Sequence, residues 1–559
     1  MFPISNIRFA TGRPNLLEDS DETGTLTILR VRPSRRFLTS AHAAASRSIP
    51  VRRDLSRNAA DRSRSWERIR NCYNHQRVAP GRDAQLFRIL RTSGAAPCRN
   101  GNRLPVLMHH SLFLESPERS RIPMSRSSLT PASSIPVRFS QRRSFTHELA
   151  ISFLMQQAVE NPQVISLAAG LVDMETLPTS IVQQVIGEIM SSPALGKAAL
   201  QYGTTPGYVK LRRLLMQHYA DMEQQDANAL DFDLEQVLLT TGSQQLLSLV
   251  CEVLFDPGDI CIVAGPTYFV FAGNLAGVGA RTVTIPIDEE GMITSQLEQT
   301  LADLDERGEL SRVKLIYIVS YYDNPAGTCL STARRAEVVD VARRWSRDHR
   351  ILILEDAAYR ELRYDGEEFP SIRSFDPGGE HVIYTQTFSK TFSPGVRVGY
   401  GIVPKDLVQP ICDRKGNEDF GSSNLAQHLI AKVIRDGLYE KHLSEVKHGY
   451  RVKRDAMVGA AQEHFSDIRG VSWHATHGGL YVWMTLPDEI ETGFESRLFQ
   501  AAVEAGVMYV PGQICYAEDH PDPPRNQMRL SFGVQTPSGI ELGMQRLATA
   551  IKQTMSQPG

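Results

Sequence analysis

The sequence predicts an α/β fold: a large domain with a mostly parallel sheet flanked by helices, beside a smaller α+β domain. From about residue 141, short apolar runs such as VKLIYIVS and ILILED alternate with helical stretches such as TARRAEVVDVARRWSRD. Uninterrupted apolar runs are typical of parallel strands that are buried on both faces. After about residue 430, long amphipathic stretches precede VSWHATHGGLYVWMTLP, VMYV and MRLSF, which is the order expected of a smaller domain.

The composition of the chain changes at about residue 140. The first 140 residues contain 24 Arg, no Lys and ten acidic residues, although the whole chain has a net charge of −2. A segment so rich in Arg, Ser and Pro buries too little apolar surface to offset the entropy of ordering. We therefore expect residues 1–140 to be a disordered extension. The alternatives are a transit peptide, an Arg-rich nucleic-acid-binding arm, or translated non-coding sequence ahead of a start at Met124.

The rest of the chain divides into three predicted parts. Residues 141–195 are expected to form the N-terminal part of the small domain. The apolar strand runs place the large domain at residues 196–430. The amphipathic stretches that follow them place the C-terminal part of the small domain at residues 431–559.

Composition also argues against several classes of protein. The most hydrophobic stretch, QQLLSLVCEVLF, contains Glu252 and is shorter than the roughly 18 residues that span a bilayer. The seven cysteines are scattered without a C-x-x-C pair and the histidines are not clustered, so we expect no metal site. We expect a soluble cytoplasmic protein without a membrane or nucleic-acid partner, with organellar targeting as the alternative location.

The polar residues that follow the predicted strands are the candidate site residues, because ligands bind beyond the carboxyl ends of strands in α/β sheets. Ser243 and Gln244 begin a helix after VLLTT, where free N–H groups favour a phosphate, although Ser is also an ordinary helix cap. Asp356 ends ILILED, and a carboxylate there needs a cation, either an arginine or a protonated pyridine. Asn324, in YYDNPAGT, is placed to bind a ligand oxygen or to form a plain turn.

A single lysine, Lys390, lies in TQTFSKTFSPGVRVGY, after another apolar strand and seven residues before Arg397. An amine held in a partly apolar pocket near other cations becomes a nucleophile for carbonyl groups. A lysine considered alone is more often a solvated surface residue. Taken by themselves, these residues leave both interpretations open.

Nine segments, in order from about residue 145 to 555, resemble the class I/II aminotransferases of the fold type I pyridoxal-phosphate (PLP) enzymes. They are SLAAGLVDMETLP, LQYGTTPGYVKLR, TTGSQQLL, GPTYF, DNPAGT, EDAAYREL, TFSKTFSPGVRVGY, THGGLYVWM and NQMRLSF. The resemblance implies a seven-stranded type of sheet and a small domain built from both ends of the catalytic region. Ala326 and Thr387 stand where the family usually has Thr and Ser, and these changes keep the backbone turn and a hydroxyl.

The resemblance also implies a cofactor site. Lys390 matches the lysine that forms an aldimine with PLP, and Asp356 matches the carboxylate that keeps the pyridine nitrogen protonated. Tyr359 and Asn324 match the partners of the phenolic oxygen, and Tyr268 matches the ring that stacks on the pyridine. The residues that match the phosphate cradle are Ser243, Gln244, Thr387, Ser389 and Arg397, with Tyr202 reaching the phosphate in the neighbouring subunit of a homodimer.

On the substrate side, Arg529 matches the arginine that binds the substrate α-carboxylate, a task suited to its planar fork. Gly170 matches backbone that lines the substrate side, together with Asn324. The implied enzyme moves an amino group from an L-amino acid to a 2-oxo acid by a ping-pong mechanism through a Lys390 aldimine. The resemblance is strongest to the branch that includes 2-aminoadipate, kynurenine and valine–pyruvate aminotransferases.

Two other functions are compatible with these motifs. Some transcription regulators resemble this catalytic region and carry an N-terminal winged helix-turn-helix, which residues 1–140 do not display as a pattern. The same lysine also serves PLP enzymes that catalyse β-elimination, decarboxylation or cyclopropane formation, and a fold does not decide among reactions. The motifs do not identify the amino donor.

Overall fold

The structure is a computed structural model that describes residues 137–145, 163–168, 170–517 and 519–556. Nearly all of the predicted extension 1–140, with the targeting, nucleic-acid-binding and start-site hypotheses made for it, lies outside the described residues. The predicted domain boundaries at residues 195 and 430 stay predictions. Within the described ranges, no helix is both long and apolar enough to cross a membrane.

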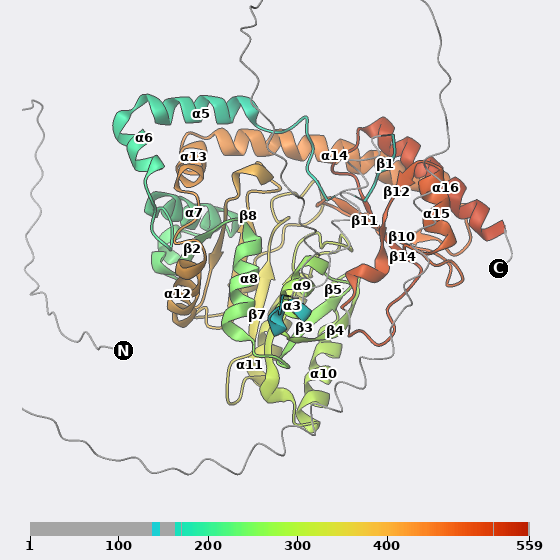
Figure 1. The fold of residues 1–559 in the computed structure, drawn as a ribbon, viewed down its shortest axis with the longest axis horizontal. Helices are drawn as coiled ribbons and strands as arrows, with labels where there is room; N and C mark the ends of the chain where they lie inside the picture. Colours follow the sequence, from blue (N-terminus) through green and yellow to red (C-terminus); the bar gives the residue numbers. More distant parts are fainter. Residues whose placement is uncertain (1–136, 146–162, 169, 518, 557–559) are drawn as a thin grey trace, which may run out of the picture. The chain divides into compact units, whose positions relative to one another are not determined.

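An eight-stranded sheet forms the centre of the described chain (Figure 1). Its order is β2 (Val237–Thr240), β9 (Gly399–Ile402), β8 (Val382–Thr387), β7 (Leu352–Asp356), β6 (Val313–Val319), β3 (Ile260–Gly265), β4 (Arg281–Asp288) and β5 (Gly291–Met292). The strands from β8 to β4 are parallel, and β9 is antiparallel to both of its neighbours. The predicted α/β fold with a mostly parallel sheet is confirmed. The sheet has one strand more than the seven-stranded type that the resemblance implies, and we identify the additional strand as the two-residue β5 at the edge.

Both faces of this sheet are buried. Along β6, Leu315, Tyr317 and Val319 belong to one apolar cluster, whereas Ile316 and Ile318 belong to another. This alternation follows from the two-residue period of a strand and explains the uninterrupted apolar runs in the sequence. The first cluster includes residues of α8 (Ser243–Leu254) and α9 (Phe269–Val278), and the second includes residues of α10 (Thr294–Glu306) and α11 (Thr332–Trp345).

The C-terminal region contains a four-stranded antiparallel sheet of order β10 (Ser472–Trp473), β11 (Tyr481–Thr485), β14 (Gln527–Ser531) and β13 (Val510–Pro511). Beside it, β1 (Ile165–Ser166) pairs in parallel with β12 (Val507–Met508). This pairing brings the stretch before Gly170 against the C-terminal region. The order and pairing of these strands therefore determine which part of the chain faces the end of the large sheet.

The other described helices pack around these sheets (Figure 1). They are α3 (Gln141–Ser144), α5 (Thr179–Ser191), α6 (Pro193–Leu200), α7 (Val209–Met222), α12 (Val408–Glu418), α13 (Asn424–Arg435), α14 (Leu438–Phe465), α15 (Arg497–Glu504) and α16 (Pro537–Ser556). The 28-residue α14 packs against α16. Its first turn carries Tyr439, which is fully buried.

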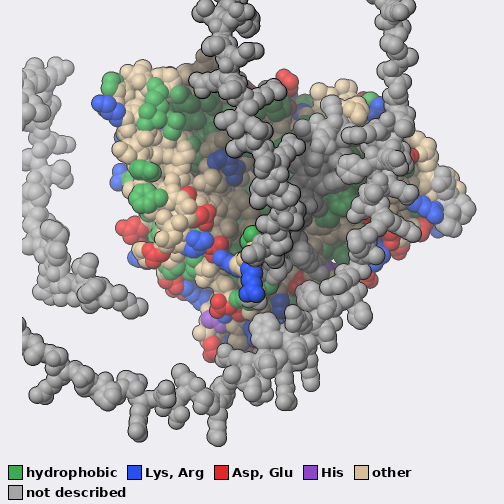
Figure 2. Space-filling view, in the orientation of Figure 1, with side chains coloured by type: hydrophobic (Ala, Val, Ile, Leu, Met, Phe, Trp, Pro, Cys, Tyr) green, Lys and Arg blue, Asp and Glu red, His purple; other side chains and the backbone are tan. Residues whose placement is uncertain are grey.

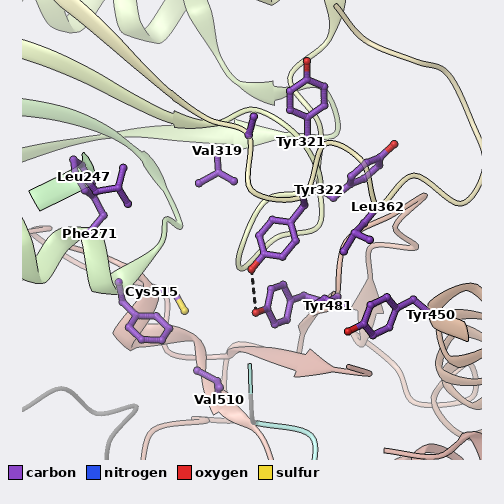
Figure 3. Packing of buried hydrophobic residues seen from close by; sticks show 14 of the residues in the cluster. Leu247, Phe271, Val319, Tyr321, Tyr322, Leu362, Tyr450, Tyr481, Val510 and Cys515 are labelled. Atoms are coloured by element: carbon purple, nitrogen blue, oxygen red, sulfur yellow. Dashed lines mark hydrogen bonds between the residues drawn. The ribbon is translucent and has the colours of Figure 1, made fainter. Parts of the chain in front are cut away.

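The larger apolar cluster continues from the large sheet into the C-terminal region. Leu247 and Val319 of the sheet side belong to the same cluster as Tyr481, Val510 and Cys515 (Figure 3). Because interiors pack at nearly crystalline density, a shared core holds the two regions in a fixed relation. That fixed relation determines the geometry of the pocket that lies between them.

Candidate active site

A pocket of about 400 Å³ lies at the carboxyl ends of β7 and β8, beside the start of α8 and facing β11 and β14. All but one of the predicted site residues line it: Gly170, Ser243, Gln244, Tyr268, Asn324, Asp356, Tyr359, Thr387, Ser389, Lys390, Arg397 and Arg529. The exception is Tyr202, whose exposed fraction is 80% and whose ring contacts Phe420. The structure thus brings these residues together, while the role of each stays a prediction.

Lys390 lies in the turn that follows β8, and its Nζ donates a hydrogen bond to the Gly170 carbonyl at 3.2 Å. The next residue, Thr391, is buried and anchors this turn. Its Oγ1 lies 2.8 Å from the Tyr439 hydroxyl, which is 2.9 Å from Glu361 Oε2. The turn that carries the amine is therefore fixed from behind by polar contacts, and its lysine is left to face the pocket.

The carboxylate behind this turn is itself paired. His218 Nε2, from α7, lies 3.0 Å from Glu361 Oε1. Burial raises the pKa of Glu361, but His218 and the Tyr439 hydroxyl outweigh this effect and hold it below its ordinary value. Glu361 is therefore ionised, and an ionised acceptor makes a stronger hydrogen bond with Tyr439.

Asp356 ends β7 and is buried against the pocket. Its Oδ2 accepts a hydrogen bond from the Tyr317 hydroxyl at 3.0 Å, and its Oδ1 accepts one from the Ala358 N–H at 3.2 Å. Burial raises the pKa of Asp356 to about 6, and no ion pair with it is present among the described residues. A buried carboxylate with no cation fits a protonated pyridine nitrogen, which would supply the missing positive charge.

The start of α8 and the turn after β8 form a cradle for an anion. Gly242, with φ of 71°, precedes α8, and a Cβ there would lie 2.9 Å from Arg397 Nη2. Arg397 donates to the Thr241 carbonyl at 3.1 Å and to Ser389 Oγ at 3.5 Å. The absence of a Cβ at Gly242 lets the Arg397 guanidinium lie beside the start of α8. A guanidinium beside a helix N-terminus attracts anions, so this arrangement fits a compact phosphate site.

Two hydroxyls complete this cradle. Thr387 Oγ1 lies 2.9 Å from Ser389 Oγ, and both side chains are buried at the end of β8. Ser243 and Gln244, the first residues of α8, line the same side of the pocket. Hydroxyl and backbone donors together with one fixed cation are the groups that hold a phosphate monoester.

Two tyrosines line the middle of the pocket. Tyr268 immediately precedes α9, and Tyr359 lies three residues after Asp356. Burial raises the pKa of both hydroxyls above the ordinary value, so each is a neutral donor at physiological pH. The Tyr359 hydroxyl lies 3.2 Å from that of Tyr481, which also lines the pocket.

Arg529, on β14, forms the opposite end of the pocket and is almost fully buried. Its Nη1 donates to Asn324 Oδ1 and its Nη2 to the Ala168 carbonyl, both at 2.8 Å. Its Nε has no hydrogen-bond partner in the described structure, and no described carboxylate pairs with the guanidinium. A buried cation without a counter-ion fits a carboxylate from a ligand.

Several residues that line or support the site were not predicted from the sequence. Tyr481 belongs to the motif THGGLYVWM, yet nothing in that motif distinguishes it from a core aromatic. Phe269 follows the predicted Tyr268, and its ring lies 5.7 Å from the Arg529 guanidinium. Tyr317 supports Asp356 from within an apolar strand, where no local signal separates a functional hydroxyl from a buried one. Only the pairing of β6 with β7 reveals it.

Comparison with known proteins agrees with this geometry. Residues 162–547 match the family model described as aminotransferase class I and II. The chain belongs to this family. The predicted family, the predicted fold and the assignment as a PLP-dependent aminotransferase are thereby confirmed.

Three similar proteins illustrate the range of this aminotransferase family. An aromatic-amino-acid aminotransferase of Thermococcus litoralis is 35% identical over 71% of this chain and 90% of its own length. A kynurenine aminotransferase of Pyrococcus horikoshii, crystallised with pyridoxamine phosphate, is 33% identical with a TM-score of 0.68, covering 75% of this chain and 97% of its own. An uncharacterized HTH-type transcriptional regulator of Bacillus subtilis is 26% identical over 72% of this chain and 77% of its own length.

Proposed function

We propose that this aminotransferase moves the amino group of a neutral amino acid with a bulky apolar side chain to a 2-oxo acid, in two half-reactions at the described pocket. The observation that carries the proposal is the convergence of Asp356, Lys390 and Arg529 on one cavity of about 400 Å³. The reaction needs three groups, and these residues supply them. Asp356 is a carboxylate without a cation, Lys390 is an amine, and Arg529 is a cation without a carboxylate.

Different residues of the pocket would hold different parts of the cofactor. Asp356 would hold the ring nitrogen, Tyr359 and Asn324 would hold the phenolic oxygen, and Tyr268 would cover the ring. The start of α8, with Arg397 and the hydroxyls beside it, would hold the phosphate. When bound, PLP supplies an aldehyde that combines with amines and a ring that withdraws electrons from the adjacent carbon.

The protein groups then carry the proton and orient the substrate. Arg529 binds the α-carboxylate and fixes the direction of the Cα–H bond, as orientation is a large part of catalysis. Lys390 Nζ would take up the Cα proton as a base and, once protonated, would give it up again as an acid. With the cofactor bound, Asp356 would stay ionised and would keep the ring nitrogen protonated.

The lining of the pocket supports an apolar side chain on the donor. Leu171, Phe269, Val270 and Tyr481 contribute apolar surface. The cations among the described lining residues are Lys390, Arg397 and Arg529, and each already has a role. The names of the aromatic-amino-acid and kynurenine enzymes given above agree with this choice.

A cytoplasmic homodimer with shared active sites is part of the proposal. Tyr202 does not line the pocket of its own chain, and large apolar side chains that precede it in the sequence or contact it are exposed: Leu195 at 43%, Leu200 at 68% and Phe420 at 64%. Hydrophobic side chains gather over α5 and α6 (Figure 2). Contiguous apolar surface commonly marks an interface. We expect the protein to sediment as a dimer, and a catalytically competent monomer would contradict shared sites.

A half-reaction screen tests the proposed function. PLP-loaded protein is mixed with one amino acid at a time, and the 2-oxo acid released per cofactor is measured by mass spectrometry. Phenylalanine, tyrosine, kynurenine and leucine are expected to release one equivalent, while aspartate is expected to react slowly. Rapid release from aspartate alone would overturn the substrate class, and the absence of release from every donor would overturn transamination.

A further inference from the structure

We propose that Tyr481 is a positioning residue that joins the two ends of the pocket, with its hydroxyl orienting Tyr359 and its ring holding Arg529. The inference rests on the proposed function, because it concerns the same cofactor and the same substrate carboxylate. It adds a residue that the sequence motifs did not assign. Tyr481 lies in the core between the two regions, with Val319 on one side and Tyr450 on the other (Figure 3).

The first half of the argument is the hydroxyl pair. The Tyr481 and Tyr359 hydroxyl oxygens lie 3.2 Å apart, and their rings meet edge to face at 5.9 Å. Only one proton lies between two hydroxyls, so one tyrosine donates and the other is left to donate elsewhere. If Tyr481 donates to Tyr359, the Tyr359 proton is directed into the pocket toward the phenolic oxygen.

Burial raises the pKa of Tyr359 well above its ordinary value, so its hydroxyl keeps its proton and can donate it into the pocket. A hydroxyl that accepts a hydrogen bond is a better donor in turn, because consecutive hydrogen bonds polarise one another. Tyr481 therefore strengthens the hydrogen bond that Tyr359 makes.

The second half of the argument is the contact of the Tyr481 ring with Arg529. The guanidinium carbon lies 4.4 Å from the ring centroid. Both side chains are almost fully buried, and a cation over an aromatic face is worth most where water is excluded. The ring fixes the plane of the guanidinium while Asn324 and the Ala168 carbonyl hold its two ends.

The strands explain why one side chain reaches both partners. Tyr481 on β11 pairs with Ser531 on β14, and Arg529 is two residues earlier on β14, so both side chains share a face of the sheet. The hydroxyl also lies close to the loop that Lys390 contacts. A Cβ on Gly170 would be 3.1 Å from it, and Lys390 Nζ donates to the Gly170 carbonyl.

The decisive variant is Tyr481→Phe, which removes the hydroxyl and keeps the ring. We expect kcat to fall about fivefold to tenfold with KM changed less than about twofold, the size of one lost hydrogen bond. The pH at which the visible absorbance of bound PLP changes should move upward by about half a unit, because a weaker donor stabilises negative charge on the phenolic oxygen less. This spectral shift is a readout that a loss of stability does not produce.

A second variant, Tyr481→Leu, removes the ring as well. We expect the affinity for 3-phenylpropionate, a carboxylate that cannot react, to fall about tenfold beyond any effect of Tyr481→Phe, because the cation–π contact is lost. The matched control is Tyr509→Phe, which removes another buried hydroxyl of the C-terminal region, bonded to the Thr492 carbonyl and outside the pocket lining. It should leave the spectrum and the affinity unchanged.

The outcomes separate this inference from the proposed function. A Tyr481→Phe protein with wild-type kcat and an unmoved spectral transition would overturn the positioning role while transamination stands. Equal losses in Tyr481→Phe and Tyr509→Phe, with equal falls in melting temperature, would also overturn it, since they would report stability alone. Failure of the wild-type protein to bind PLP would instead overturn the proposed function.

Discussion

The two sides of the pocket are built in different ways. The cofactor side consists of residues that follow β2, β3, β6, β7 and β8, all at the carboxyl ends of strands of the large sheet. The substrate side consists of Gly170, Tyr481 and Arg529, which come from three distant parts of the chain. The first side depends on local strand–turn patterns, and the second depends on how β1, β11 and β14 assemble.

This difference predicts different responses to substitution. Changes on the cofactor side should alter the absorbance or affinity of bound PLP together with the rate. Changes on the substrate side should alter the affinity for amino acids while the cofactor signal persists. Three contacts join the two sides: Asn324 accepts a hydrogen bond from Arg529 Nη1, the Tyr481 hydroxyl lies beside that of Tyr359, and Lys390 donates to the Gly170 carbonyl.

The largest expected effect comes from Lys390→Ala on the cofactor side. Because it removes both the amine that combines with PLP and the carrier of the Cα proton, kcat should fall by about 10⁴-fold or more. Borohydride should no longer fix PLP to the protein. Lys405→Ala changes a lysine whose side chain is 79% exposed and should behave as wild type. A Lys390→Ala rate within tenfold of wild type would contradict the assignment.

Asp356→Asn keeps the shape of the side chain and removes its charge. We expect kcat to fall by about 10²-fold to 10³-fold, the usual effect of losing one preorganised electrostatic group, and PLP to bind more weakly. Equilibrium dialysis and initial rates measure the two effects. Unchanged turnover with weakened binding would assign Asp356 to affinity alone.

The cofactor-free protein gives a separate pH test of Asp356. Burial raises its pKa to about 6, so between about pH 4 and pH 6 the folded state holds a proton that the unfolded chain has released. The stability of the wild type relative to Asp356→Asn is therefore greatest below about pH 4 and falls, by on the order of 3 kcal/mol, as the pH rises through 6. Urea unfolding of both proteins at several pH values measures it. A difference that grows with pH would contradict the burial argument.

Arg529→Lys tests the substrate side, because it retains the charge and loses the planar fork. We expect KM for the amino acid to rise about 30-fold to 100-fold while the absorbance of bound PLP stays unchanged. Arg525→Lys is the control, since its side chain is 63% exposed and paired with Glu491 outside the pocket lining. If Arg529→Lys altered the PLP spectrum as strongly as Asp356→Asn, the two sides would not be separable.

The smallest expected effect comes from Tyr439→Phe, behind the turn that carries Lys390. It leaves Thr391 and Glu361 each with one partner fewer, so kcat should fall about threefold to tenfold. The melting temperature should drop only by a few degrees. Thr391→Val should reproduce the effect on kcat, because it removes the other hydroxyl of the pair. An unaffected rate in both variants would show that the turn holds Lys390 without this support.

The sequence alone determined the α/β architecture and most of the cofactor side. Parallel strands place their carboxyl ends at one edge, so residues that directly follow apolar runs are expected to meet, as Asp356 and Lys390 do. Family resemblance added Arg529 and Gly170, whose proximity no local pattern implies. The predicted role of Tyr202 rests on resemblance as well.

Only the tertiary structure revealed the supports of these residues. Tyr317 looks like any apolar strand residue until β6 pairs with β7, and Tyr481 looks like a core aromatic until the register of β11 and β14 sets it beside Arg529. The Glu361, Tyr439 and Thr391 contacts likewise join three distant segments. Local sequence specifies strand and turn, because those depend on neighbouring residues. Which buried hydroxyl meets which carboxylate or cation depends on packing between segments, and packing is decided only when the whole chain has folded.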